Sequence, residues 1–169
     1  MTDAAEVISE GSRQFLTFIL ADEEYAVDIL RVQEIRGWMP VTRIPNAPKY
    51  MKGVLNLRGA IIPVVDLRAR FGLETREYGP TTVVVVVWVN SGSKQRCIGL
   101  VVDAVAETYT IPLTEIRGAP MMGSGIDPAY IEGLATVDEK MVILMDIDYL
   151  LNTGDLECEA ADHAPAESA

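Results

Sequence analysis

The sequence predicts a mostly β protein made of two small barrels packed side by side. Three observations lead to this fold class: one stretch is repeated, each half carries roughly five short strand-like runs, and long helical patterns are missing. Gly53 to Phe71 aligns with Gly133 to Leu151 without a gap, at a spacing of 80 residues. A repeat of this kind indicates one unit built twice. A doubly wound α/β fold is excluded because it needs long crossover helices.

A second, looser repeat extends this relationship towards the N-terminus. Ala26, Val32 and Glu34 match Gly99, Val105 and Glu107 at a spacing of 73 residues, so an insertion separates the two repeated blocks. The copies differ most in charge at one point. Arg58-Gly59 of the first copy corresponds to Asp138-Glu139 of the second, which makes Arg58 a candidate functional residue.

The first half reads as strands joined by short turns. Residues 14–27 carry partly alternating apolar positions around a polar turn, which is typical of a β-hairpin. Asp28 is placed to cap one helical turn, which Gly37 and Pro40 keep from extending. Residues 53–65 form two strand-like runs separated by Arg58-Gly59 at hairpin distance. Asp66 is expected to cap a short helix over residues 67–71.

The second half follows the same plan. Thr81 to Val89 is nearly all apolar and β-branched, which predicts a strand buried on both faces with Trp88 as a core anchor. Further strands are expected over 96–102 and 103–110, then a closing hairpin over 131–145. A short helix over 147–152 ends the folded part.

Length and composition predict one soluble folded unit with flexible ends. The 169 residues are 49% apolar and 23% charged, and the longest apolar run, residues 83–89, is too short to span a membrane. The start lacks the features of a signal peptide and the two cysteines are far apart, so we expect a cytoplasmic protein. We expect a flexible tail over 1–13, a folded region over 14–153 and a disordered acidic tail over 154–169. The first barrel is expected over about 14–76 and the second over about 81–153, with strand exchange between them as an alternative.

Charge is distributed unevenly along the chain. Residues 31–76 carry nine basic and three acidic residues, whereas the total net charge is −11. An acidic protein of this kind repels a phosphate backbone, which argues against nucleic acid as a partner. Protein partners fit this polarity better.

Catalytic motifs are missing from the sequence. The single histidine, His163, lies in the predicted tail, and no phosphate-binding glycine loop, CxxC or HExxH motif is found. We therefore expect no enzyme activity, no cofactor and no metal. Two other functions remain open: a small hydrolase that uses Asp66 and Asp146 as paired carboxylates, and a β-barrel module that binds a ligand. Capping of the short helices explains both aspartates without chemistry.

Several long motifs resemble the CheW-type coupling proteins of bacterial chemotaxis. The resemblance covers about residues 14–152 and is carried by DEEYAVDILRVQEIRG (22–37), VTRIPNAP (41–48), KGVLNLRGAIIPVVDLR (52–68), IGLVVDAV (98–105) and MVILMDIDYLL (141–151). It implies two interlocked five-stranded SH3-like β-barrels around a shared hydrophobic core. It also implies a non-enzymatic adaptor that joins the cytoplasmic tips of methyl-accepting chemoreceptors to the regulatory domain of the histidine kinase CheA.

The resemblance further implies where the partners bind. The receptor-facing groove of the family maps to Val32, Glu34, Gly53 and Arg58. Met121 and Met122 lie between Pro120 and Gly123, in a loop where a core role is difficult to arrange, and together with Arg117 they are our candidates for kinase binding. Such a protein is recruited to receptor arrays at the membrane without inserting into it, and it assembles into mixed rings with kinase domains. The alternatives within this group, a CheA regulatory domain and a CheV-type adaptor, need additional domains.

Overall fold

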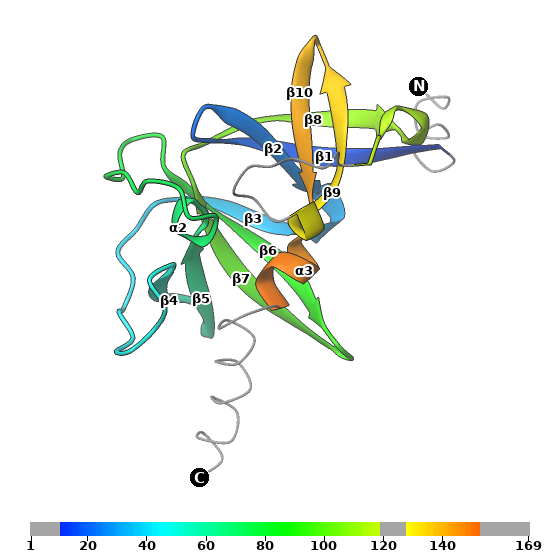
Figure 1. The fold of residues 1–169 in the computed structure, drawn as a ribbon. Helices are drawn as coiled ribbons and strands as arrows, with labels where there is room; N and C mark the ends of the chain where they lie inside the picture. Colours follow the sequence, from blue (N-terminus) through cyan, green and yellow to red (C-terminus); the bar gives the residue numbers. More distant parts are fainter. Residues whose placement is uncertain (1–10, 119–127, 153–169) are drawn as a thin grey trace.

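The computed structural model describes residues 11–118 and 128–152, which form two five-stranded sheets joined by short helical turns (Figure 1). Sheet A contains, in spatial order, β8 (Ala104–Pro112), β1 (Ser12–Leu20), β2 (Glu23–Asp28), β10 (Lys140–Met145) and β9 (Ile131–Val137). Sheet B contains β3 (Val32–Gly37), β6 (Val83–Ser91), β7 (Lys94–Val102), β5 (Ala60–Asp66) and β4 (Met51–Leu57). The helical segments are η1 (Ile29–Arg31), α2 (Leu67–Arg70), η2 (Leu113–Glu115), η3 (Pro128–Tyr130) and α3 (Ile147–Asn152). The mostly β fold class is therefore confirmed.

The two sheets exchange strands between the two halves of the chain. Sheet A takes β1 and β2 from the first half and β8, β9 and β10 from the second, while sheet B takes β6 and β7 from the second half and β3, β4 and β5 from the first. The alternative with strand exchange therefore describes the fold, because each sheet combines three strands of one half with two strands of the other. The strands interlock, so neither half of the sequence contains a whole barrel.

Strand register places the repeated residues at equivalent positions. Each sheet has one parallel pair, which joins a strand of one half to a strand of the other. In sheet B Val64 of β5 lies opposite Gly99 of β7, and in sheet A Leu144 of β10 lies opposite Ala26 of β2. Val64 and Leu144 are equivalent residues at the spacing of 80, and Ala26 and Gly99 are equivalent at the spacing of 73. The two barrels therefore repeat one backbone plan.

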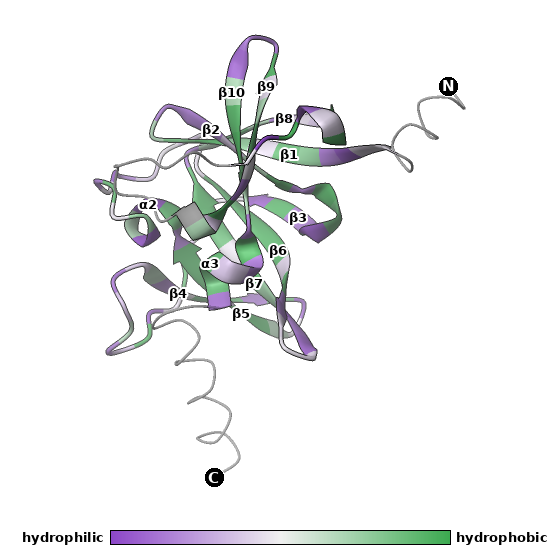
Figure 2. Ribbon diagram, turned by 45° about the vertical axis from the view of Figure 1, so that its right-hand side comes forward, coloured by the Kyte–Doolittle hydropathy of each residue, from purple (hydrophilic) through white to green (hydrophobic). Residues whose placement is uncertain are grey.

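A shared core lies between the sheets, and each barrel also encloses a smaller one. In β6, Val85, Val87 and Val89 face the shared core, whereas Val84 and Val86 face the inside of sheet B. This alternation explains why the run is apolar on both faces. The smaller core of sheet A contains Phe15, Ala26, Ile111, Ala135, Val142 and Leu144. Figure 2 shows apolar strand segments where the two sheets face each other and polar residues in the outer turns.

The N-terminal boundary differs from the prediction of a flexible tail over 1–13. Strand β1 begins at Ser12, and the guanidinium of Arg13 lies 2.9 Å from a carboxylate oxygen of both Asp28 and Glu132. The salt bridges hold Arg13 on sheet A. Pairing of the first residues of β1 with β8 extends the strand to Ser12.

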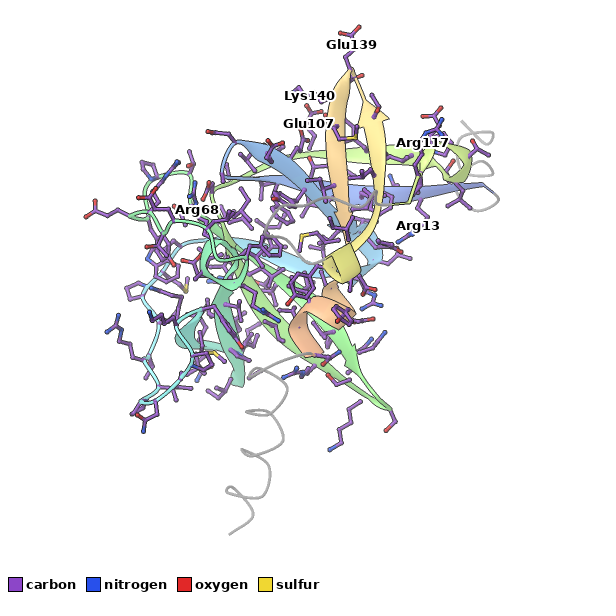
Figure 3. All side chains as sticks on the ribbon, viewed as in Figure 1. Arg13, Arg68, Glu107, Arg117, Glu139 and Lys140 are labelled. Atoms are coloured by element: carbon purple, nitrogen blue, oxygen red, sulfur yellow. The ribbon has the colours of Figure 1, made fainter. Side chains whose placement is uncertain are left out.

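Two bidentate ion pairs join the halves of the molecule. Arg31, at the connection from β2 to β3, donates to Asp148 of α3 at 2.6 and 2.8 Å. Arg68 of α2 donates to Asp103, at the connection from β7 to β8, at 2.8 and 2.9 Å. Figure 3 labels Arg68 beside α2, on the side of the molecule away from Arg117. We call these contacts the two inter-half ion pairs.

The predicted caps and hairpins are found at the expected places. The Asp28 side chain accepts from the backbone N–H of Leu30 at the start of η1, and the Asp66 side chain accepts from those of Arg68 and Ala69 at the start of α2. Turns at residues 21–22, 58–59 and 138–139 close antiparallel hairpins through positive φ angles. Strand β3, in contrast, was not expected from the sequence.

Candidate functional site

The candidate receptor residues meet where the two edges of sheet B approach each other. Val32 and Glu34 lie on β3, which is one edge strand, and Arg58 lies in the turn between β4 and β5 at the other edge. A pair of backbone hydrogen bonds between Thr42 and Val54, 2.8 and 3.0 Å long, ties the segment after β3 to β4. The closure of the barrel therefore brings Arg58 to Glu34. We call Val32, Glu34, Arg36 and Arg58 the β3–turn site.

Arg58 is held by its backbone and leaves most of its side chain in solvent. Its φ is 51°, a left-handed conformation that the following Gly59, with φ 90°, continues. The side chain of Asn56 accepts from the backbone N–H of Gly59 at 2.9 Å, which fixes the turn. The Arg58 side chain is 65% exposed, although one of its N–H groups donates to Glu34. An exposed guanidinium of this kind suits a forked contact with an anionic group.

Glu34 lies between two arginines. Its Oε1 accepts from Arg58 and its Oε2 accepts from Arg36 at 3.1 Å. The hydrogen bond from Arg58, followed by that from Arg36, lowers the pKa of the Glu34 carboxyl, although partial burial opposes the shift. Glu34 therefore stays charged at neutral pH and orients Arg58.

Gly53 has a different role from the surface contact that the resemblance implies. It is buried, and with a φ of 148° its backbone is in a region that favours glycine. A Cβ at this position would lie 2.2 Å from the carbonyl oxygen of Thr42. Gly53 therefore allows the segment after β3 to approach β4, which positions the site and does not line it. Gly133 does the same in the second barrel, where a Cβ would lie 2.9 Å from the carbonyl oxygen of Arg117.

An apolar groove of about 410 Å³ adjoins the β3–turn site. Its walls include Gln33, Arg58, Ile61, Trp88 and Cys97. The expectation that Trp88 is a core anchor is wrong, because its side chain is half-buried at the end of β6 and lines this groove. Ile61, 62% exposed beside Arg58, is a candidate contact residue that sequence reasoning missed.

Cys97 behaves as a packed and unreactive thiol. Its Sγ lies 2.7 Å from the side-chain oxygen of Gln33 and it packs against the core of sheet B. Burial raises the pKa of the Cys97 thiol, and the charge of Glu34 raises it further. The thiol therefore stays protonated at neutral pH.

Arg117, one of the candidate kinase residues, belongs to the other barrel. Arg117 pairs through its backbone with Leu134 of β9, with hydrogen bonds of 2.7 and 2.8 Å. Together with Glu115 and Met141 these residues line a groove of about 510 Å³. Met121 and Met122 lie outside the described residues. Figure 3 labels Arg117 at the end of sheet A that lies far from α2.

The two aspartates of the hydrolase alternative are engaged in structural contacts. Asp66 caps α2 and accepts from the Tyr78 hydroxyl, while Asp146 accepts from the backbone N–H of Tyr149 at 3.1 Å. In residues 11–118 and 128–152 there is no group of three side chains that could hold a metal ion. None of the helices in these ranges is long and apolar enough to cross a membrane.

Comparison with known proteins matches nearly the whole described chain to one family. The family model for the CheW-like domain matches residues 14–155. The chemotaxis protein CheW of Klebsiella aerogenes is 44% identical over 144 residues, which are 85% of this chain and 84% of that protein. CheW of Rhizobium meliloti is 38% identical over 148 residues, 88% of this chain and 93% of its own. The crystal structure of the scaffolding protein TtCheW from Thermoanaerobacter tengcongensis superposes with a TM-score of 0.76 at 35% identity, covering 85% of this chain and 90% of that one.

Proposed function

This chain belongs to the CheW-like family and is a chemotaxis coupling adaptor, and from that premise we propose that it joins the cytoplasmic tips of chemoreceptors to the regulatory domain of the histidine kinase CheA. The observation that carries the proposal is the family match over residues 14–155. The protein acts without catalysis, in the cytoplasm, where it is recruited to receptor arrays at the membrane. Neither a cofactor nor a metal takes part.

The receptor binds at the β3–turn site in this proposal. Arg58 supplies an exposed guanidinium, and Glu34 orients it. The strand that carries Glu34 and the turn before it also expose apolar side chains: Ile35 is 43% exposed on β3, and Leu30 is 83% exposed in the adjacent turn η1. Exposed apolar residues around a charged centre are the usual composition of a protein interface. Val32 lies between them at the start of β3.

The kinase binds at the other barrel in this proposal, around Arg117, Met121 and Met122. The groove beside Arg117 and the half-exposed Met141 supports this assignment, because adaptable apolar side chains suit a protein interface. Because the two barrels present different surfaces, we expect head-to-tail contacts between neighbouring subunits. Such contacts generate a ring when the rotation from one subunit to the next adds up to a full turn. We therefore include mixed rings of this protein and kinase domains in the proposal.

Reconstitution of the kinase complex tests the adaptor role. Receptor-containing membranes and CheA are combined with and without the purified protein, and autophosphorylation of the kinase is measured. We expect kinase activity to rise only when receptor, kinase and this protein are all present. Kinase activity that does not depend on the added protein, with no co-sedimentation on the membranes, contradicts the proposal.

Serine replacement of both methionines tests the kinase face. Met121→Ser/Met122→Ser is expected to weaken co-purification with the CheA regulatory domain by more than tenfold and to leave receptor co-sedimentation unchanged. Normal kinase binding with loss of receptor binding shows that the two faces are assigned the wrong way round. Circular dichroism before and after heating checks that the variant folds.

A further inference from the structure

The β3–turn site contains two guanidinium groups and one carboxylate. Glu34 accepts from Arg58 with one oxygen and from Arg36 with the other. Among the described residues, no second carboxylate forms a salt bridge with either arginine. The three side chains therefore carry one uncompensated positive charge. Arg58 is the more exposed of the two arginines, at 65% against 34% for Arg36.

The other neighbours of Glu34 do not alter this charge balance. Burial raises the pKa of the Cys97 thiol on β7, and the nearby charge of Glu34 raises it further, so the thiol is neutral. Gln33, which contacts Cys97, is uncharged. Charged groups thus face Glu34 from two elements, with Arg36 on its own strand and Arg58 on the β4–β5 turn.

We propose that the receptor tip supplies an acidic side chain that pairs with Arg58, and that Arg36 is the positioning residue that keeps Glu34 paired when this happens. The inference rests on the proposed receptor site and names the chemistry of the group it recognises. A carboxylate opposite Arg58 completes a set of two arginines and two carboxylates. Because Arg58 is then shared between two anions, Glu34 depends on Arg36 for compensation.

The proposal predicts a change in proton uptake that a merely structural role of Arg36 does not produce. In the wild-type protein Glu34 is charged in both the free and the bound states, since at least one arginine remains paired with its carboxylate. In an Arg36→Gln variant the pKa of Glu34 is higher in the complex than in the free protein. Such a group takes up a proton on binding, so the affinity of the variant rises as the pH falls.

The experiment is isothermal titration calorimetry with the cytoplasmic tip fragment of a methyl-accepting chemoreceptor, at pH 5 and pH 7.5, in pairs of buffers with different ionisation enthalpies. The wild type is compared with Arg36→Gln and with Arg43→Gln. Arg43 is an exposed arginine of the same half, outside the site, so its replacement removes one positive charge without touching Glu34. The thermal midpoint of each variant is recorded as a control for folding.

We expect Arg36→Gln to bind about fivefold more weakly than Arg43→Gln at pH 7.5, and within about twofold of it at pH 5, with proton uptake that the control lacks. A deficit that is the same at both pH values, or no deficit relative to Arg43→Gln, overturns the role of Arg36. An Arg58→Gln variant in the same series separates the two hypotheses. If Arg58→Gln binds like the wild type, the receptor site itself is wrong; if it fails to bind while Arg36→Gln behaves as the control, only this inference is wrong.

Discussion

The two barrels share a backbone plan but present opposite charges at equivalent ends. In sheet B the β4–β5 turn carries Arg58, which pairs with Glu34. In sheet A the equivalent turn between β9 and β10 carries Asp138 and Glu139, and the equivalent of Glu34 is Glu107. Figure 3 labels Glu139 at the outer tip of that hairpin. A cation in one barrel thus corresponds to an acidic group in the other.

On the third strand of each half, the residue two positions after the glutamate also differs: sheet B has a basic residue there and sheet A does not. Where β3 has Arg36, the equivalent position of β8 has Tyr109. Burial raises the pKa of the Tyr109 hydroxyl, and the carboxylates of Glu24, Glu107 and Asp138 raise it further. The acidic end of sheet A should repel an anionic partner, whereas the proposed receptor site in sheet B should attract one. The two barrels thus keep the same strand pairing and differ in surface charge.

The largest effect is expected at the glycines that let each barrel close. Gly53→Ala should lower the free energy of unfolding by about 3 kcal/mol or more, because the new Cβ meets a backbone oxygen that cannot move alone. Gly133→Ala should cost less, about 1 to 3 kcal/mol, since its Cβ would lie 2.8 Å from a methyl group of Ile116 and 2.9 Å from the carbonyl oxygen of Arg117, against 2.2 Å from the carbonyl oxygen of Thr42 at Gly53. Urea unfolding of both variants measures the difference. Equal costs would show that the two closures are equally tight.

Breaking the inter-half ion pairs should have the next largest effect on the free energy of unfolding, and the two pairs should differ in this cost. Arg68→Met leaves Asp103 without its partner where the arginine side chain was only 8% exposed, and should cost about 2 to 4 kcal/mol. Arg31→Met removes a pair whose side chains are 28% and 30% exposed, and should cost about 1 kcal/mol. Chemical denaturation with Arg43→Met as the control compares them. A larger loss for Arg31→Met contradicts this ranking.

Charge reversal at the equivalent turns should separate recognition from folding. Arg58→Glu should change the free energy of unfolding by within about 0.5 kcal/mol, because the residue is mostly exposed. Receptor binding should fall more than tenfold, since reversing an interfacial charge costs roughly 2 kcal/mol or more. Asp138→Arg, the matched change in sheet A, should leave receptor binding intact. Wild-type receptor affinity in folded Arg58→Glu protein would falsify the assignment of the receptor site.

Acid should weaken both inter-half ion pairs, with a smaller effect. Hydrogen bonds from Arg31 lower the pKa of Asp148 against the opposing effect of burial, and hydrogen bonds from Arg68 and from the Ala21 backbone do so for Asp103. A carboxyl whose pKa is lowered in the folded state stabilises the fold above its unfolded value, near 3.9, and this stability is lost as the pH falls below it. Unfolding free energies at pH 6 and pH 3 should therefore differ less in Asp148→Asn and Asp103→Asn than in the wild type. An unchanged pH dependence in both variants would show that these carboxylates are not linked to folding.

The parts of the fold that local chemistry dictates could be predicted from the sequence. Asp28 and Asp66 cap their helical turns, and the Arg58-Gly59 turn closes a hairpin, because short-range hydrogen bonds and backbone preferences decide them. Strand β3 was missed because its residues alternate poorly in hydrophobicity, and it becomes a strand only by pairing with β6. The same holds for the assignment of strands to barrels, which depends on parallel pairs between distant segments. Non-local pairing leaves little trace in local patterns.

The candidate site shows the same division. Arg58 was found because it departs from the repeat, and Glu34 because the resemblance maps it to the same groove. Arg36 was not found, since an arginine two residues along a strand becomes a neighbour of Glu34 only when both side chains face the same side. Trp88 was placed in the core because its run is apolar, although its own side chain is half-buried and lines a groove.

The charges of the inter-half ion pairs also decide which half completes which barrel. Arg68 and Asp148 are equivalent residues, each two positions after the capping aspartate of its helix, and Arg31 and Asp103 both lie between the second and third strands of their halves. The first half thus contributes two arginines and the second half two aspartates. A half that folded back on itself would bring Arg31 to Arg68, or Asp103 to Asp148, and like charges would repel. Exchange of strands is therefore the topology in which every one of these residues meets its opposite, and repulsion between like charges disfavours folding into two separate barrels.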